Sequence, residues 1–251
     1  MKNVVFILCH QDDEFGVFAS IKTAIEKKEN VFIFYMTSGV IKKTIPKSVI
    51  SKRDKESLSV LLRLGVKRKN IFFLGRKNNI PTCYLHKNLE KAYKKLREFL
   101  KKLNGSITLI THAYEGGNED HDSCNIIVLK IIKNFKKIIS AYQFPLYNNS
   151  SFLYYSVQKP LPNNGKILRI KSSLPNRLKF ITYLFHYKSQ LKVWIGLYPF
   201  LIFGLLFRNY FILQKMNKKF IIKKPYEKKL LYEKFRNTTY SDLKLRFDKF
   251  F

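Results

Sequence analysis

The chain has 251 residues, which is enough to bury one full hydrophobic core, and it carries a formal net charge of +31 at pH 7. Such a charge favours anionic partners, but the lysines are spread along almost every predicted helix, and no helix-turn-helix, zinc-finger or ribonucleoprotein motif accompanies them. The composition therefore argues against a nucleic-acid-binding protein, and its excess of Lys, Asn, Ile, Phe and Tyr is also what a very AT-rich coding sequence produces.

The first predicted element is a buried strand that ends in a polar cluster. Asn3–Cys9 is a short apolar run, typical of a strand that is covered on both faces of a parallel sheet. His10, Asp12 and Asp13 follow directly, at the strand end where open α/β sheets bind ligands. Imidazole and carboxylate suit a zinc-type divalent metal, with Asp12 left for proton transfer. The alternative is that one of the aspartates simply caps the next helix.

The N-terminal run does not have the features of a signal peptide, because it is short, lacks a small-residue cleavage site and continues into the polar cluster. Cys9, Cys83 and Cys124 are scattered without a metal-type spacing, which suits free thiols in a reducing compartment. We therefore expect a cytoplasmic protein.

A helix and a second strand are predicted next. Phe15–Lys28 has apolar residues at helical spacing, and Val31–Met36 is again a short apolar run. Thr37 and Ser38 follow this strand at the same edge of the sheet. We expect them to line a substrate pocket; otherwise they are part of a turn.

An amphipathic helix is predicted over Ser48–Leu64, and Gly65 should end it. Arg53 and Glu56 lie on this helix at i, i+3. The spacing allows a surface ion bridge between them.

Strands and helices continue to alternate up to Lys133. Ile71–Leu74 is a third short strand, and Asn88–Leu103 is a helix with a basic outer face. Between them lies a loop whose His86 we expect at the surface. The alternation predicts an α/β, Rossmann-like core with a mostly parallel sheet flanked by helices.

A second strand ends in metal-type side chains. Ser106–Thr111 is an apolar strand candidate, and the loop after it carries His112 and His121 together with several acids. The pair Gly116-Gly117 lets that loop turn sharply before the helical pattern Ile126–Ile132. His121 lies at the helix start, where its ring can turn back toward the strand ends. Two such clusters rarely arise together by chance.

Together the two clusters resemble a known family. Cys9–Glu14 is similar to the Ala-His-Pro-Asp-Asp-Glu signature of the LmbE/PIG-L superfamily of N-acetylglucosaminyl deacetylases. His112–Asp122 is similar to its second signature, His-Ala-Tyr-Glu-Gly-Gly-His-Pro-Asp-His-Asp in bacterial members. Arg53–Glu56 resembles the Arg-x-x-Glu helix of the family, which implies that Arg53 faces the sugar instead of forming an ion bridge with Glu56. Lys188–Gln190 resembles a helix that follows the core sheet of the family. The likeness runs from the first residue to about Gln190.

The resemblance implies a hydrolase that uses Zn²⁺, or another divalent metal, to remove the acetyl group from an N-acetylated amino sugar. The metal ligands of the family fall on His10, Asp13 and His121, and its general base falls on Asp12. Asp120 would orient a ring nitrogen of a site histidine.

The chain departs from the family signatures at three positions. Gln11 and Glu119 replace two prolines, and neither is a ligand. Asn118 stands where the family usually has a histidine that stabilises the developing oxyanion. Asn still donates a hydrogen bond but brings no positive charge, and loss of a strong oxyanion donor costs roughly 10²–10³ in rate. His112 is the alternative donor.

Residues 146–251 are expected to elaborate a parallel core formed by residues 1–145, within one domain. Phe152–Gln158 and Lys166–Lys171 flank Asn163-Asn164-Gly165, which predicts a hairpin. Pro175–Leu191 is helical, and Tyr226–Glu233 resembles the closing strands of some family members. Lys137–Tyr142 is the last predicted strand of the core.

The segment 193–224 combines an apolar stretch with lysines. Val193–Phe207 is shorter than the ~20 residues that a membrane span needs, and Pro199 interrupts it. It is either a core helix or an interfacial patch, and the lysines over Lys215–Lys224 would face anionic headgroups. We hypothesise peripheral contact with an anionic membrane, on its cytoplasmic face.

Two functions follow from these patterns. The first is a zinc-dependent deacetylase acting on a GlcNAc-type sugar, carried by a phosphate- or lipid-linked glycan precursor. The second is a catalytically weak or silent sugar-binding relative, an alternative that Asn118 keeps open.

Overall fold

Five apolar runs of the sequence form a parallel sheet. They are β1 (Lys2–Leu8), β2 (Asn30–Tyr35), β3 (Ile71–Phe73), β4 (Ser106–His112) and β5 (Ile138–Phe144). They lie in the order β3-β2-β1-β4-β5. This computed structural model describes residues 2–41, 46–151, 156–219 and 221–251.

Two strands from the C-terminal part extend the sheet beyond β5. β9 (Tyr210–Lys215) runs antiparallel to β5, and β8 (Ile167–Lys171) runs antiparallel to β9. A separate pair, β6 (Tyr147–Asn148) and β7 (Ser156–Val157), is also antiparallel. The predicted mostly parallel α/β sheet is therefore confirmed, with an antiparallel edge.

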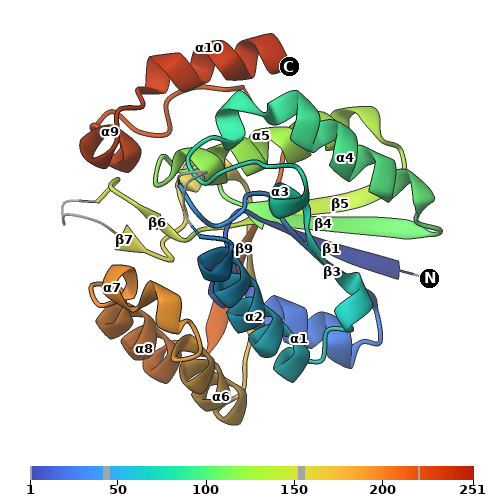
Figure 1. Cartoon of the computed structure of the whole chain (residues 1–251), viewed down its shortest axis with the longest axis vertical. Coiled ribbons are helices and arrows are strands. Elements are labelled where there is room, and N and C mark those ends of the chain that lie inside the picture. The colour runs from blue at the N-terminus through green and yellow to red at the C-terminus, as the bar shows by residue number, and fades with distance from the viewer. Residues whose placement is uncertain (1, 42–45, 152–155, 220) are drawn as a thin grey trace.

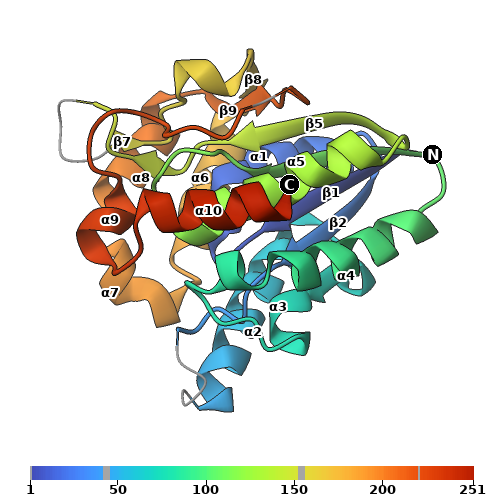
Figure 2. The same cartoon turned by 90° about the horizontal axis from the view of Figure 1, so that it is seen from above.

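Helices cover both faces of this sheet (Figure 1). One face carries α1 (Phe18–Glu26), α2 (Lys47–Leu64), α6 (Leu174–Leu184), α7 (Leu191–Trp194) and α8 (Tyr198–Phe207). The other carries α3 (Leu74–Lys77), α4 (Leu89–Lys102), α5 (Glu119–Asn134) and α10 (Tyr240–Phe250), and Figure 2 shows α10 lying along α5. α9 (Leu231–Phe235) precedes α10. The described chain also contains short 3-10 helices: η1 (Asp13–Val17), η2 (Arg68–Asn70), η3 (Leu85–Lys87), η4 (Pro162–Asn164) and η5 (Lys188–Gln190).

The central strand β1 shows why the sheet is buried on both sides. Val5 and Ile7 pack into the core under α4 and α5, whereas Phe6 and Leu8 pack into the core under α1 and α2. All four side chains are fully buried, so the strand carries no solvent face. The predicted end of α2 is also confirmed, because Gly65 has φ +99, a left-handed cap that favours glycine.

The predicted C-terminal hairpin is wrong in its pairing. Ile167–Lys171 pairs with Tyr210–Lys215, which lies beyond three intervening helices, and Ser156–Val157 pairs with Tyr147–Asn148. Residues 152–155 of the predicted first strand lie outside the described residues. Residues 163 and 164 instead belong to η4, and Gly165 ends that helix.

The tail is also helical where closing strands were predicted. Leu231–Phe235 forms α9, and the following α10 buries Leu243, Phe247 and Phe250 against the core at i, i+4 and i+7. The helix predicted over Pro175–Leu191 ends at Leu184.

The apolar stretch that begins at Val193 is divided between α7 and α8. In the described parts of the chain, we find no helix with the length and apolar character needed to traverse a bilayer.

Candidate metal centre

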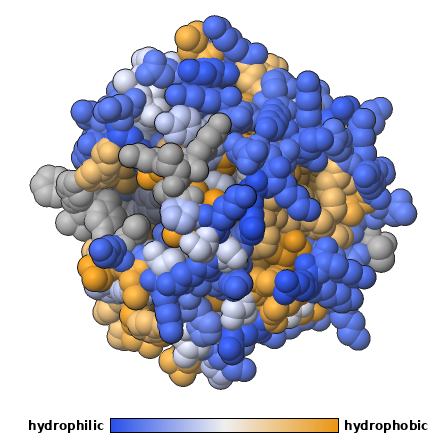
Figure 3. Space-filling view, viewed as in Figure 1, coloured by the Kyte–Doolittle hydropathy of each residue, from blue (hydrophilic) through white to orange (hydrophobic). Residues whose placement is uncertain are grey.

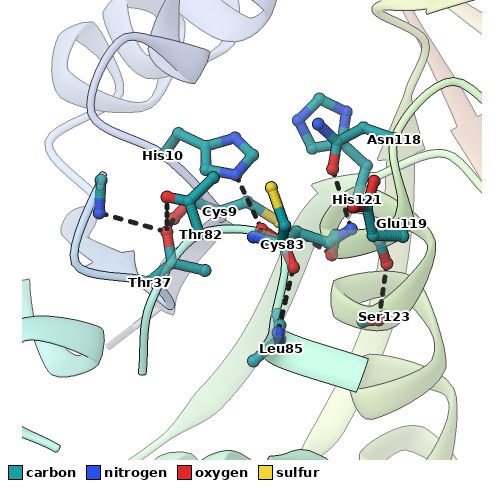
Figure 4. Close-up of polar contacts among 12 residues, drawn as sticks. Cys9, His10, Thr37, Thr82, Cys83, Leu85, Asn118, Glu119, His121 and Ser123 are labelled. Carbon is teal, nitrogen blue, oxygen red and sulfur yellow. Dashed lines mark hydrogen bonds and ion pairs between the residues drawn. The ribbon is translucent and has the colours of Figure 1, made fainter. Parts of the chain in front are cut away.

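Two loops meet at the carboxyl ends of β1 and β4. These strands are parallel neighbours in the sheet, and the order of the strands reverses at this point. Such a reversal opens a crevice between the loops, the usual ligand site of an open α/β sheet. In the first loop His10 lies in the turn after β1 and Asp13 begins η1. The start of α5 brings His121 from the second loop, and Figure 4 shows His10 and His121.

Asp13 is the acceptor at the centre of this crevice. Its Oδ2 accepts hydrogen bonds from the backbone N–H groups of Cys9, at 3.0 Å, and His10, at 2.6 Å. The same atom lies 3.1 Å from Nε2 of His112, and Oδ1 lies 3.4 Å from Nε2 of His121. Burial opposes ionisation, but the three neighbouring imidazoles hold the pKa of Asp13 well below its ordinary value.

The ring nitrogens of His121 are available to bind a metal. Both of its ring nitrogens are buried, and among the described residues neither has a hydrogen-bond partner. Its ring stacks on that of His112 with centroids 4.0 Å apart, and burial lowers the pKa of His121, which favours the neutral imidazole. A neutral imidazole beside a carboxylate is the ligand form that a divalent metal requires.

Donor atoms of four buried residues lie close enough to share one ion. Cys9, Asp13, His112 and His121 each offer an atom, and these atoms all lie within 4.8 Å of one another. Sulfur, nitrogen and carboxylate oxygen form a donor set that fits a zinc-type divalent ion.

His10 stands at the open side of this group. Its Nε2 lies 3.0 Å from Oδ2 of Asp120, its Nδ1 lies 3.5 Å from Oδ2 of Asp13, and its ring centroid is 5.2 Å from that of His121. Burial lowers the pKa of His10, but the carboxylates of Asp13 and Asp120 outweigh it and raise that pKa to about 10. The three predicted ligands are thus brought together.

Asp120 holds His10 from behind. Its carboxylate also accepts from the backbone N–H groups of Cys83, at 2.6 Å, and Leu85, at 3.0 Å, so its position is fixed by the chain before α4. This is the contact with a site histidine that the sequence led us to expect of Asp120.

Cys9 and His112 lie on the inner side of the group. The Cys9 thiol lies 3.0 Å from the carbonyl oxygen of Asp120 and 2.9 Å from Sγ of Cys124. His112 Nε2 accepts from the Cys9 N–H at 3.1 Å, and burial lowers the pKa of His112 to about 3. Neither residue lines the cavity described next, so His112 does not lie where an oxyanion donor would meet a substrate.

A cavity of about 350 Å³ opens in front of this donor group. Five residues singled out in the sequence line it: His10, Asp12, Asp13, Arg53 and Asn118. Tyr147, Trp194 and Arg236 complete its wall from distant parts of the chain.

Asp12 is held on both oxygens. Nε1 of Trp194 donates to Oδ2 at 3.0 Å, and Nη2 of Arg53 lies 3.7 Å from Oδ1. Burial raises the pKa of Asp12 to about 7, against the lowering effect of the Arg53 guanidinium. Its backbone has φ +131, which is strained for any residue other than glycine and turns the side chain into the cavity.

Arg53 faces the cavity, and the surface ion bridge with Glu56 is wrong. The Arg53 guanidinium donates to the backbone carbonyls of Gly39 and Gln11, and its side chain is only 11% exposed. Glu56 instead accepts from the backbone N–H and the hydroxyl of Ser189.

Asn118 has two functions at the start of α5. Its Oδ1 accepts from the backbone N–H of Asp120 at 2.8 Å, which makes it the N-cap of the helix. Its Nδ2 is therefore turned toward the cavity, 3.5 Å from the Tyr147 hydroxyl. An asparagine at this position caps the helix and still presents one N–H donor.

Thr37 and Ser38 lie behind the cavity wall. The Thr37 hydroxyl donates to the Cys9 carbonyl at 2.8 Å and lies 3.2 Å from Oγ1 of Thr82 (Figure 4). Ser38 donates to the carbonyl of Val40, and both side chains are buried. The part of this loop that lines the cavity is residues 39–41 rather than the predicted pair.

Sequence patterns gave no sign of Trp194 and Tyr147. Trp194 lies 182 positions from Asp12, inside an apolar stretch. Tyr147 is positioned by Glu115, which accepts from its backbone N–H at 3.1 Å, and by Gly117, where a Cβ would collide with the Tyr147 carbonyl. The glycine pair of the second cluster was the one available signal.

The expectation that His86 lies at the surface is wrong. The residue is 6% exposed in η3, which packs against α5 and α10. Burial lowers the pKa of His86 to about 4.

Known proteins share this fold. The family described as PIG-L: GlcNAc-PI de-N-acetylase matches residues 5–132. No curated protein matches the sequence.

Among solved structures, the zinc-inhibited form of teicoplanin deacetylase Orf2 has a TM-score of 0.63 and 14% identity, covering 86% of this chain and 100% of that one. The N,N'-diacetylchitobiose deacetylase of Pyrococcus horikoshii has a TM-score of 0.57 and 18% identity, covering 96% and 88%. The A40926 pseudoaglycone deacetylase Dbv21 has a TM-score of 0.58 and 16% identity, covering 77% and 84%. At these identities the likeness is one of fold.

Proposed function

The chain belongs to the PIG-L family of GlcNAc-PI de-N-acetylases, and we propose on that premise that it removes the N-acetyl group from a GlcNAc-type amino sugar. The observation that carries the proposal is the meeting of His10 and Asp13 beside Asp12 in one cavity, with His121 in contact with Asp13 just inside its wall. A metal site next to a constrained carboxylate supplies the Lewis acid and the general base that metal-dependent hydrolysis of an amide uses.

His10, Asp13 and His121 are the proposed metal ligands. Asp13 lies between the two rings, with His10 Nδ1 3.5 Å from its Oδ2 and His121 Nε2 3.4 Å from its Oδ1. His10 and Asp13 line the cavity, and His121 lies behind them. Cys9 is less suited to the role, because its thiol is engaged on the inner side of the group by the carbonyl oxygen of Asp120 and by Sγ of Cys124. A divalent ion held there would act as a Lewis acid on the acetyl carbonyl and on the attacking water.

Asp12 is the proposed general base. Trp194 and Arg53 fix its two oxygens, so the carboxylate is aimed before the substrate arrives. It would accept the proton of the attacking water and later deliver one to the leaving amine.

Asn118 and Tyr147 are the proposed donors to the developing oxyanion. The Asn118 amide and the Tyr147 hydroxyl lie 3.5 Å apart, so both point to the same part of the cavity. Two neutral donors would take the place of one cationic histidine. Arg53 is the residue best placed to hold a sugar hydroxyl or a phosphate of the carrier.

Release of acetate tests the proposal. Purified protein loaded with Zn²⁺ should release acetate from N-acetylglucosamine, its 1-phosphate or N,N'-diacetylchitobiose, and Asp13→Ala should abolish both metal retention and release. A metal-replete protein that binds these sugars but never releases acetate would support the sugar-binding alternative instead.

A further inference from the structure

Helix α8 presents an aromatic face to solvent. Leu201 and Leu205 pack into the core, while Phe203 is 64% exposed and Phe207 is 71% exposed on the other side of the helix. The two exposed rings lie with centroids 4.4 Å apart. Ile195, in the turn before α8, is 71% exposed.

This face borders a groove. A cavity of about 780 Å³ lies between α8, the end of β7 and the start of β9, and Phe200, Phe203, Phe207 and Tyr210 are among its lining residues. Figure 3 shows apolar atoms gathered at the lower left of the molecule, where Figure 1 places α7 and α8. Contiguous apolar patches of this kind on a soluble domain mark an interaction surface.

The surroundings of the patch are positively charged. From Ser123 to Tyr226 the sequence contains 18 Lys and Arg residues and no Asp or Glu. Lys179, Lys188 and Lys192 are exposed on α6, η5 and α7. α6 packs against α8, α7 precedes α8 in the chain, and η5 contacts α7. Glu56 of α2, which accepts from Ser189, is a carboxylate beside this rim that comes from another segment. An apolar face with a rim of this excess positive charge matches the surface of an anionic bilayer, with acyl chains inside and phosphates outside.

The geometry fits docking along the bilayer rather than insertion across it. α8 has ten residues, which is about 15 Å of helix. This is half of the roughly 30 Å thickness of a hydrocarbon core, so the helix would lie in the plane of the interface.

We propose that α7 and α8 form a membrane-docking surface that places Ile195, Phe203 and Phe207 in the headgroup region of an anionic lipid bilayer. The cationic part is assigned to Lys188 and Lys192 rather than to Lys215, because Lys215 lies at the end of β9 opposite to the groove.

Docking in this way has a consequence for the candidate catalytic cavity. Trp194 and Leu197, from α7 and the turn after it, line that cavity. The cavity mouth and the docking surface therefore belong to one short stretch of chain, and a bound bilayer would lie close to the site. The docking itself does not depend on the proposed deacetylation.

Co-sedimentation of the full chain with vesicles tests the surface. We expect binding to phosphatidylcholine vesicles with about one-third phosphatidylserine, weaker binding to pure phosphatidylcholine, and a loss of about tenfold or more in affinity for Phe203→Ser/Phe207→Ser. The matched control is Ile139→Ser/Leu245→Ser, which removes two side chains that are 60% and 57% exposed elsewhere, and which should bind like the wild type. Equal binding by the Phe203→Ser/Phe207→Ser variant and the wild type would overturn the proposal.

A second measurement locates the contact. The wild-type protein has one tryptophan, Trp194, and it is only 2% exposed, so brominated lipids should quench its fluorescence little. The added tryptophan of Phe203→Trp should be quenched on anionic vesicles, and that of Leu245→Trp should not. Absence of quenching in Phe203→Trp on bound vesicles, or a dimer in light scattering that Phe203→Ser/Phe207→Ser dissociates, would assign the face to another partner.

The contribution of the positive charges to membrane binding can be tested separately from that of the apolar face. Lys188→Gln/Lys192→Gln should weaken binding to the anionic vesicles by about tenfold or more and leave binding to pure phosphatidylcholine unchanged. Undiminished affinity for anionic vesicles would contradict the cationic part of the surface.

Discussion

Asp12 is the most constrained carboxylate of the site, because its backbone is strained and both its oxygens have partners. Asp12→Asn keeps the shape and the Trp194 contact but removes the proton acceptor. We expect retained metal and a fall in turnover of about 10²–10⁴. Metal content by mass spectrometry, measured beside acetate release, checks this; a variant that loses the metal would identify Asp12 as a ligand.

Asn118 offers a cleaner test of the oxyanion donor, since its two functions can be separated. Asn118→Asp and Asn118→Ser both retain an oxygen that can cap α5, and both lack the amide N–H. We expect a melting temperature close to that of the wild type and a loss of about 10²–10³ in kcat. Wild-type kcat in both variants would mean that Tyr147 suffices. Asn118→His should raise the rate if the position holds the oxyanion donor.

His86 links stability to pH. Its pKa is about 4 in the folded chain and 6.5 ordinarily, so below pH 6.5 the unfolded chain binds a proton that the folded chain refuses. The contribution of neutral His86 is complete above pH 6.5 and is lost as the pH falls toward 4. We expect urea titrations to show that His86→Gln loses about 1–2 kcal/mol less of its free energy of unfolding between pH 7 and 4 than the wild type. Parallel pH curves for the two proteins would refute the assignment.

The residues that could be predicted from sequence are those fixed by strand ends. His10, Asp12 and Asp13 follow β1 directly, so their place at the crevice depends on one strand alone. The positions of Thr37 and Ser38 depend on which way a loop turns, and hydrogen bonds to Cys9 and Val40 turn them inward. No pattern in the local sequence indicates which way this loop turns.

Helix α7 is the element that brings the C-terminal part of the chain to the site. Trp194→Phe keeps the aromatic packing against Phe15 and Tyr187 but removes the hydrogen bond to Asp12. We expect kcat to fall about tenfold while KM, metal content and melting temperature change little. This split identifies a positioning residue; an equal loss of stability and KM would indicate that Trp194 only fills space.

Elements with local signals were predictable, and elements that depend on distant partners were not. The five parallel strands and α2 each carry their own periodicity and end signals. The pairing of β8 with β9 depends on three helices folding back between them, and sequence spacing favoured a nearer partner. α10 has a plain amphipathic pattern, but the tail was assigned by its resemblance to strands in relatives.

The whole molecule should gain stability from the metal, because the ligands come from loops that meet only in the folded state. At a free Zn²⁺ concentration about 100-fold above Kd, binding adds roughly 2.7 kcal/mol, or about 5–10 °C in Tm for a chain of this size. Thermal unfolding with and without a chelator checks this. His121→Ala should show no such shift, and an equal shift in that variant would place the ion elsewhere.

The order of the strands also separates two events during synthesis. A nascent chain that has left the ribosome only as far as β5 already contains His10, Asp13 and His121, and the sheet that holds them together. It still lacks Trp194 and Arg236, which close the cavity, and Tyr187, whose hydroxyl donates to buried Glu14 at 2.8 Å. Capture of the ion can therefore begin on the translating ribosome, whereas the surroundings that aim Asp12 are completed only near the end of translation.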